Sequence, residues 1–206
     1  MSYPNAKQFV YLTNSGAHFA TKTATADDDR KALQVLLKHS STPKLAEFLR
    51  LLKAELDKPS MEQAISLFNK NYIAAKDQPL VINESSNEDR ILDTLKKLSD
   101  TQHCAICDQD GFLLFHTGFD INQAEQAALL AVEISDLQTK RQQNMQDFSG
   151  TESSFISITD NDGQSQLRFW PMHFNAQIFF LAIKGNPLLN DSNFTHLTWL
   201  LSQKYL

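Results

Sequence analysis

Apolar and polar positions beyond about residue 87 alternate with two periods, one typical of helices and one typical of strands. The pattern predicts, in order, a helix over 87–100, strands over 103–108 and 112–117, a helix over 122–146, strands over 154–159, 166–174 and 177–184, and a last helix that begins at Asp191 or Ser192. Asp110-Gly111 separates the first two strands and is a strong hairpin signal. This order predicts an α+β fold around a five-stranded antiparallel sheet.

The pattern before residue 80 is mainly helical. Two β-prone runs, Gln8 to Thr13 and His18 to Thr23, flank Asn14-Ser15-Gly16 and predict a small hairpin, since Asn and Gly tolerate positive φ. Three helices are predicted after it, over 28–38, from Thr42-Pro43 to about residue 57, and from Ser60 onward, followed by a returning strand. This arrangement is typical of a winged-helix unit and also of generic three-helix units that never touch DNA.

A polar stretch separates the two patterns. Residues 77–79 and 83–88 are charged or polar, with one proline and no helical stripe. We therefore predict a helical module with an N-terminal hairpin over 1–80, a linker over 81–86 and an α/β domain over 87–206.

Composition and charge narrow the class of protein. Of the 206 residues 42% are hydrophobic, and no apolar run approaches the roughly 18 residues that cross a bilayer. The first residues do not resemble a secretory signal, and two cysteines cannot build a disulfide framework, so a cytoplasmic protein is expected. Residues 1–80 carry a net charge of +3 and residues 81–206 one of −8. The basic part could meet an acidic partner or nucleic acid, whereas the acidic part would repel phosphate.

The residues that could carry chemistry do not assemble into a site. Cys104 and Cys107 lie three apart in a predicted strand, so their side chains should point to opposite faces, unlike those of a redox or zinc pair. The run Asp160-Asn161-Asp162-Gly163 lacks the rest of a calcium loop and predicts a tight turn. No phosphate loop and no nucleophile elbow occur. The sequence therefore predicts no catalytic residue, no metal site and no cofactor.

The second half of the chain resembles a known family. Its hairpin carries Ile106, Asp108, Gly111, the run 113–115 and Gly118, and an alanine-rich helix over 124–132 follows. Together with the element order, these residues resemble the Roadblock family of dynein light chains and bacterial GTPase-associated proteins. Profilin-like, longin and PAS-like sensor domains share pieces of the pattern. The loop 146–153 and the bulky Phe169-Trp170 depart from it, which leaves ligand binding in the concavity of the sheet open.

The long helix has two apolar faces and so needs two burial partners. We expect one face to pack on the sheet, namely Ala127, Leu130, Ile134 and Leu137. The Roadblock resemblance implies that the second face meets its copy in a homodimer while the third strand pairs edge to edge. The predicted interface consists of Ala124, Ala128, Leu129, Ala131, Val132, Phe155 and Ile158. The alternative is that the N-terminal module covers this face.

The resemblance implies a non-enzymatic, dimeric platform that binds or regulates a small Ras-like GTPase, as in bacterial polarity or motility systems. A platform of this kind holds the switch regions of its partner and need supply no catalytic residue. Two other classes remain open: a DNA-binding transcriptional regulator with a C-terminal dimerising sensor domain, and an enzyme.

Overall fold

The structure is a computed structural model that describes residues 5–23, 27–56, 61–79, 87–149 and 156–205. In these ranges the chain forms seven helices and seven strands, and five of the strands make one antiparallel sheet. The predicted α+β class and the five-stranded antiparallel sheet are therefore confirmed. The chain divides into two compact units: unit 1 combines Met1–Arg90 with Asn190–Leu206, and unit 2 is Ile91–Leu189.

Unit 1 is a helical unit around a small ribbon of strands. Strand β1 (Phe9–Leu12) pairs antiparallel with β2 (Ile73–Lys76), far along the chain, so that Phe9 lies opposite Lys76 and Leu12 opposite Ile73. The helices of the unit are α1 (Asn14–Thr21), α2 (Asp28–Lys38), α3 (Leu45–Glu55), α4 (Met61–Asn69) and α7 (Ser192–Tyr205). Helix α2 has the predicted bounds, and its cap Asp27 accepts a hydrogen bond from the N–H of Arg30 at 2.8 Å.

The predicted N-terminal hairpin is wrong, because the run 18–23 contributes to a helix. Thr13 caps that helix, its hydroxyl oxygen accepting a hydrogen bond from the N–H of Gly16 at 3.0 Å. A Cβ at Gly16 would lie only 2.0 Å from the carbonyl oxygen of Tyr72. The glycine therefore serves close packing inside a helix, not a turn, and β1 finds its partner in β2.

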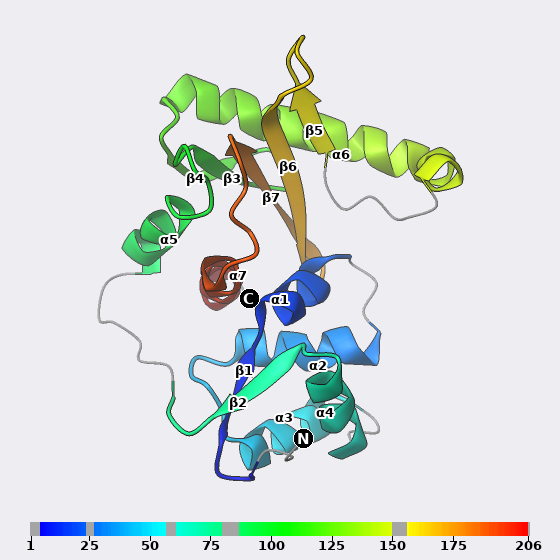
Figure 1. Cartoon of the computed structure of the whole chain (residues 1–206), viewed down its shortest axis with the longest axis vertical. Helices are drawn as coiled ribbons and strands as arrows, with labels where there is room; N and C mark the ends of the chain where they lie inside the picture. Colours follow the sequence, from blue (N-terminus) through cyan, green and yellow to red (C-terminus); the bar gives the residue numbers. More distant parts are fainter. Residues whose placement is uncertain (1–4, 24–26, 57–60, 80–86, 150–155, 206) are drawn as a thin grey trace. The chain divides into compact units, whose positions relative to one another are not determined.

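Unit 2 is built on the five-stranded sheet, whose strand order is β4-β3-β7-β6-β5. The strands are β3 (Cys104–Asp108), β4 (Leu113–Thr117), β5 (Ile156–Thr159), β6 (Ser165–Phe174) and β7 (Gln177–Lys184). Gly111, at φ +85°, adopts the left-handed conformation that the predicted turn between β3 and β4 needs. The long helix α6 (Ile121–Ser149) lies across one face of this sheet (Figure 1).

The two units divide the chain differently from the predicted domains. The boundaries fall within α5 (Asn87–Leu95) and before α7, whereas residues 87–206 were expected to form one domain and the predicted linker, 81–86, lies outside the described residues. Helix α7 groups with unit 1 because its side chains bind there. Phe194 stacks on His18 with ring centroids 4.0 Å apart, and the indole N–H of Trp199 donates to the carbonyl oxygen of His39 at 3.0 Å.

Candidate functional site

One side of α6 is buried in the core of unit 2. This side carries small residues, Ala124, Ala127, Ala128 and Ala131, and the facing strands supply Ala105, Cys107, Phe169, Phe180 and Ala182. All nine side chains are almost completely buried. Alanines let the helix backbone approach the sheet closely, to the point that the Sγ of Cys107 lies 3.7 Å from the carbonyl oxygen of Ala128.

The predicted assignment of the two faces of α6 needs correction. Three of the predicted interface residues, Ala124, Ala128 and Ala131, lie in the core of the same protomer and are closed to any partner. Leu130 and Leu137, expected to pack on the sheet, are 37% and 59% exposed. The rings of Phe169 and Phe180 fill the space above the strands, which leaves room only for small side chains on the helix. The small size of the alanines was the feature of the sequence that could have predicted their position on the inner side of α6.

The outer side of α6 carries exposed apolar residues. We name Leu129, Leu130 and Leu137 the leucine face; Leu129, which was predicted for the interface, is 59% exposed. Leu130 and Leu137 are two helical turns apart and project from the same side of the helix. Val132 is half-buried and lies beside the β3–β4 turn, where a Cβ at Gly111 would lie 3.5 Å from its methyl group.

Strand β5 forms one edge of the sheet. It pairs with β6, and in the described part of the chain no other strand meets its outer edge. Ile158 is 38% exposed and pairs with Leu167, which packs against the alanine core, so Ile158 projects on the side of the sheet that α6 covers. Phe155, the other strand residue predicted for the interface, lies outside the described residues.

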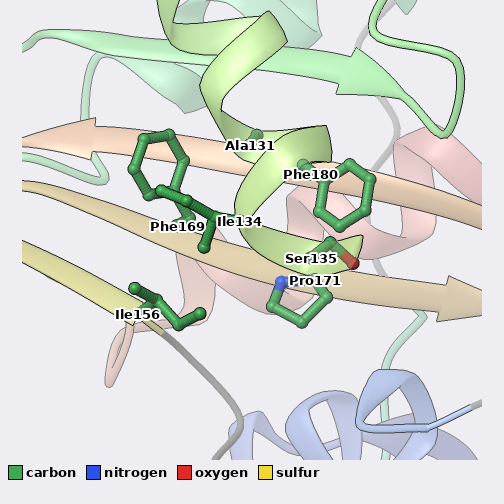
Figure 2. A pocket seen from close by; sticks show the side chains of 7 residues that line it. All are labelled: Ala131, Ile134, Ser135, Ile156, Phe169, Pro171 and Phe180. Atoms are coloured by element: carbon green, nitrogen blue, oxygen red, sulfur yellow. The ribbon is translucent and has the colours of Figure 1, made fainter. Parts of the chain in front are cut away.

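A shallow pocket lies between α6 and the neighbouring strands. Its lining comprises Ala131, Ile134, Ser135, Ile156, Phe169, Pro171 and Phe180. Figure 2 shows these seven side chains, three of them from α6. The empty volume is about 190 Å³, and part of it is open to solvent. The lining is almost wholly apolar, so this hollow offers packing space and little to orient a polar ligand.

The two cysteines lie on opposite faces of the sheet, as their spacing predicts. Cys104 pairs with Ile183 and Cys107 with Phe180, which puts the two thiols on opposite faces of the sheet. Both thiols are free and buried. Burial raises the pKa of each to about 12, so neither is a thiolate near neutral pH.

Acidic side chains in the two tight turns of unit 2 bind the backbone. Oδ1 of Asp108 accepts hydrogen bonds from the N–H groups of Asp110 and Phe112, at 3.0 and 2.9 Å. Asp160 does the same for Asp162 and Gln164, and the N–H of Gln164 is the main reason that the pKa of Asp160 lies below its usual range. The predicted turn at 160–163 is confirmed, and these carboxylates act as turn formers.

The part of the chain that the structure describes contains neither a metal-binding cluster nor a membrane-spanning helix. No three His, Cys, Asp or Glu side chains in that part of the chain gather closely enough to hold a metal ion. None of the helices described there is both long enough and apolar enough to cross a membrane.

Comparisons with known proteins give no significant match: no family model, no curated protein and no solved structure is similar to the chain. The structural features that bear on function are the leucine face, the edge strand β5 and the charge distribution.

Proposed function

We propose that the protein is a non-enzymatic, dimeric interaction platform that regulates a small Ras-like GTPase. One observation carries the proposal: the leucine face lies on the helix that covers the sheet, and the sheet ends in β5, whose outer edge meets no other strand in the described part of the chain and whose Ile158 is exposed on the same side. An exposed apolar face and an exposed strand edge both favour association with another protein surface.

The element order supports the comparison with Roadblock proteins. From α5 to α7 the chain runs helix, two strands, helix, three strands, helix. The third strand of that series, β5, lies at one edge of the sheet, and β4 lies at the other. The resemblance implies edge-to-edge pairing of that third strand in a dimer. The chain differs from the Roadblock pattern in its last helix. Helix α7 groups with unit 1, so unit 2 by itself lacks the helix that ends this element order.

The corrected interface differs from the one predicted from sequence. It comprises Leu129, Leu130, Leu137 and Ile158, all exposed in the protomer, and omits the buried alanines. Two copies related by a two-fold axis would place the same residues on both sides of the contact.

Size-exclusion chromatography with light scattering tests the dimer. We expect wild-type protein at tens of micromolar to elute as a dimer and Leu130→Glu as a folded monomer, because the contact would bury an unpaired charge. Lys97→Ala changes the net charge by the same amount at an exposed site of unit 2 and should leave the dimer intact. A monomeric wild type, or a dimer unaffected by Leu130→Glu, would refute the proposed interface.

The GTPase is tested separately. The tagged protein is used to capture partners from its own lysate with GDP or with a non-hydrolysable GTP analogue, and a small GTPase should be enriched in one nucleotide state. The enrichment of the GTPase counts as specific when a surface variant of the protein that is still folded no longer captures it. Recovery of no GTPase in either state would remove the partner from the proposal, whatever the oligomeric state.

A DNA-binding regulator remains the second candidate, because unit 1 combines several short helices with a ribbon of two strands. The winged-helix likeness of this unit is still a hypothesis. Salt-sensitive retention of the protein on duplex DNA would favour it.

A further inference from the structure

A row of alternating lysine and aromatic side chains crosses the ribbon of unit 1. Phe9 pairs with Lys76 of β2 on one side and forms a bridge with Lys44 on the other. Residues directly opposite one another in antiparallel segments project from the same face, so Lys44, Phe9 and Lys76 form one row over three chain segments. Val10 projects from the opposite face and is completely buried, which makes the row part of the outer face.

Aromatic rings hold the two lysines in this row. The Nζ of Lys44 lies 5.7 Å from the centre of the Phe9 ring, and the Nζ of Lys76 lies 5.2 Å from the centre of the Tyr11 ring. Tyr11 is largely buried and donates its hydroxyl hydrogen to the carbonyl oxygen of Gln78. Phe9 is only partly buried, so the face of unit 1 presents a ring between two cations.

Neither lysine of the row belongs to an ion pair among the described residues. Among the described residues, no carboxylate lies within 4.0 Å of the ammonium group of Lys44 or Lys76. By contrast, Lys70 lies 2.5 Å from Asp29, and Lys204 forms an ion pair with Glu88. Lys44 and Lys76 are both exposed and remain available to an anion.

We propose that this row, Lys44, Phe9 and Lys76, binds single-stranded nucleic acid, with the lysines on phosphates and a base stacked on Phe9. Nonspecific single-strand binding needs cations along the backbone and an aromatic surface for the bases, and the row combines both. An acidic peptide or a DNA duplex would use the lysines alone and leave the ring without a role. The inference goes beyond the proposed platform and does not depend on dimerisation.

The experiment measures binding of the full chain to a fluorescently labelled oligothymidylate by polarisation, over a series of salt concentrations. Each of Lys44→Ala and Lys76→Ala should reduce the slope of log K against log salt by about 0.7, the contribution of one phosphate contact on a single strand. Phe9→Leu should weaken binding roughly tenfold with an unchanged slope, because it removes a stacking surface and no charge. Lys97→Ala, in unit 2, is the matched control and should change neither quantity.

Circular dichroism establishes whether each variant is folded. If one of the alanine or leucine variants is unfolded, the conservative variants Lys44→Arg and Phe9→Tyr still provide a test. Both conservative variants should bind like wild type. The proposal is overturned if the folded wild type does not bind the oligonucleotide at low salt, or if Lys97→Ala weakens binding as much as Lys44→Ala. It is also overturned if a polyglutamate peptide binds equally well and Phe9→Leu has no effect, since the row would then be a simple anion surface.

Discussion

The two sides of α6 differ in a way that reverses the usual relation between size and burial. The side in the core carries alanines, and the side in solvent carries Leu129, Leu130 and Leu137. Leucine gains more free energy than alanine from burial, so a helix that served only to cover the sheet would be expected to turn its leucines inward. The difference indicates that close packing decides which residues lie on the inner side, and it leaves the three leucines exposed on the outer side.

The largest expected effect comes from a charge on the inner side. Ala128→Glu would place a carboxylate in the core next to Cys107, and we expect it to destabilise the fold by roughly 3–5 kcal/mol. Urea denaturation followed by circular dichroism measures the loss. Leu130→Glu carries the same new charge on the outer side and, measured at a protein concentration low enough to keep the protomer monomeric, should shift the free energy of unfolding by less than about 0.5 kcal/mol. Equal losses in the two variants would mean that the two sides are not distinct.

The rate at which the buried cysteines react with a thiol reagent tests the packing of α6 on the sheet without any substitution. The raised pKa values of Cys104 and Cys107, about 12 each, leave the folded protein at pH 8 with far less thiolate than an exposed cysteine, whose pKa is about 8.5. We expect correspondingly slow reaction with a disulfide reagent until the protein unfolds. Rapid labelling of Cys107 alone in the native protein would show that α6 separates readily from the sheet.

The same shift predicts a loss of stability in base. The unfolded chain ionises its thiols above about pH 8.5, whereas the folded chain keeps them protonated until about pH 12. The contribution of the two thiols is therefore complete below pH 8.5 and declines as the pH rises towards 12. Replacing both cysteines with alanine should flatten this part of the curve of unfolding free energy against pH.

A smaller difference in stability is expected between larger side chains at two positions on the inner side of α6. Ala124 is completely buried in the alanine core, whereas Ala131 borders the shallow pocket of Figure 2. Ala124→Val should cost roughly 1–3 kcal/mol through overpacking. Ala131→Val loses the same helix propensity but has space for its methyl groups, so it should destabilise the fold clearly less than Ala124→Val does. The two denaturation midpoints measure this difference, and a lower midpoint for Ala131→Val would contradict it.

Sequence reasoning succeeded where a local signal decides the structure. Asp110-Gly111 predicted a hairpin and formed one, because its two flanking strands are neighbours in the sheet. Asn14-Ser15-Gly16 gave a similar signal and became part of a helix, because Thr13 caps that helix and the partner of β1 is supplied by residues 73–76. Turn residues permit a turn, and long-range pairing determines whether it forms.

The faces of α6 and the location of α7 could not be predicted for a related reason. Periodicity shows that a helix has an apolar stripe, but it does not show which surface covers the stripe. The apolar pattern of α7 fits a sheet as well as it fits the helices of unit 1, where Gln203 donates to the carbonyl oxygen of Leu37 at 2.7 Å. For α6, the decisive quantity is the volume left above Phe169 and Phe180, which depends on the register of β6 and β7.

The smallest expected effect tests the outer side. Leu137→Gln replaces an exposed apolar side chain with a polar one of similar size, so the isolated protomer should keep its unfolding free energy within about 0.5 kcal/mol. If the leucine face associates, the wild type gains stability with increasing concentration, because only the folded state dimerises. Thermal unfolding is measured over about a hundredfold range of protein concentration. The melting temperature of the wild type should exceed that of Leu137→Gln at the highest concentration and equal it at the lowest. A melting temperature of the wild type that does not depend on concentration would leave the leucines as ordinary surface residues and remove the support that they give to the dimer.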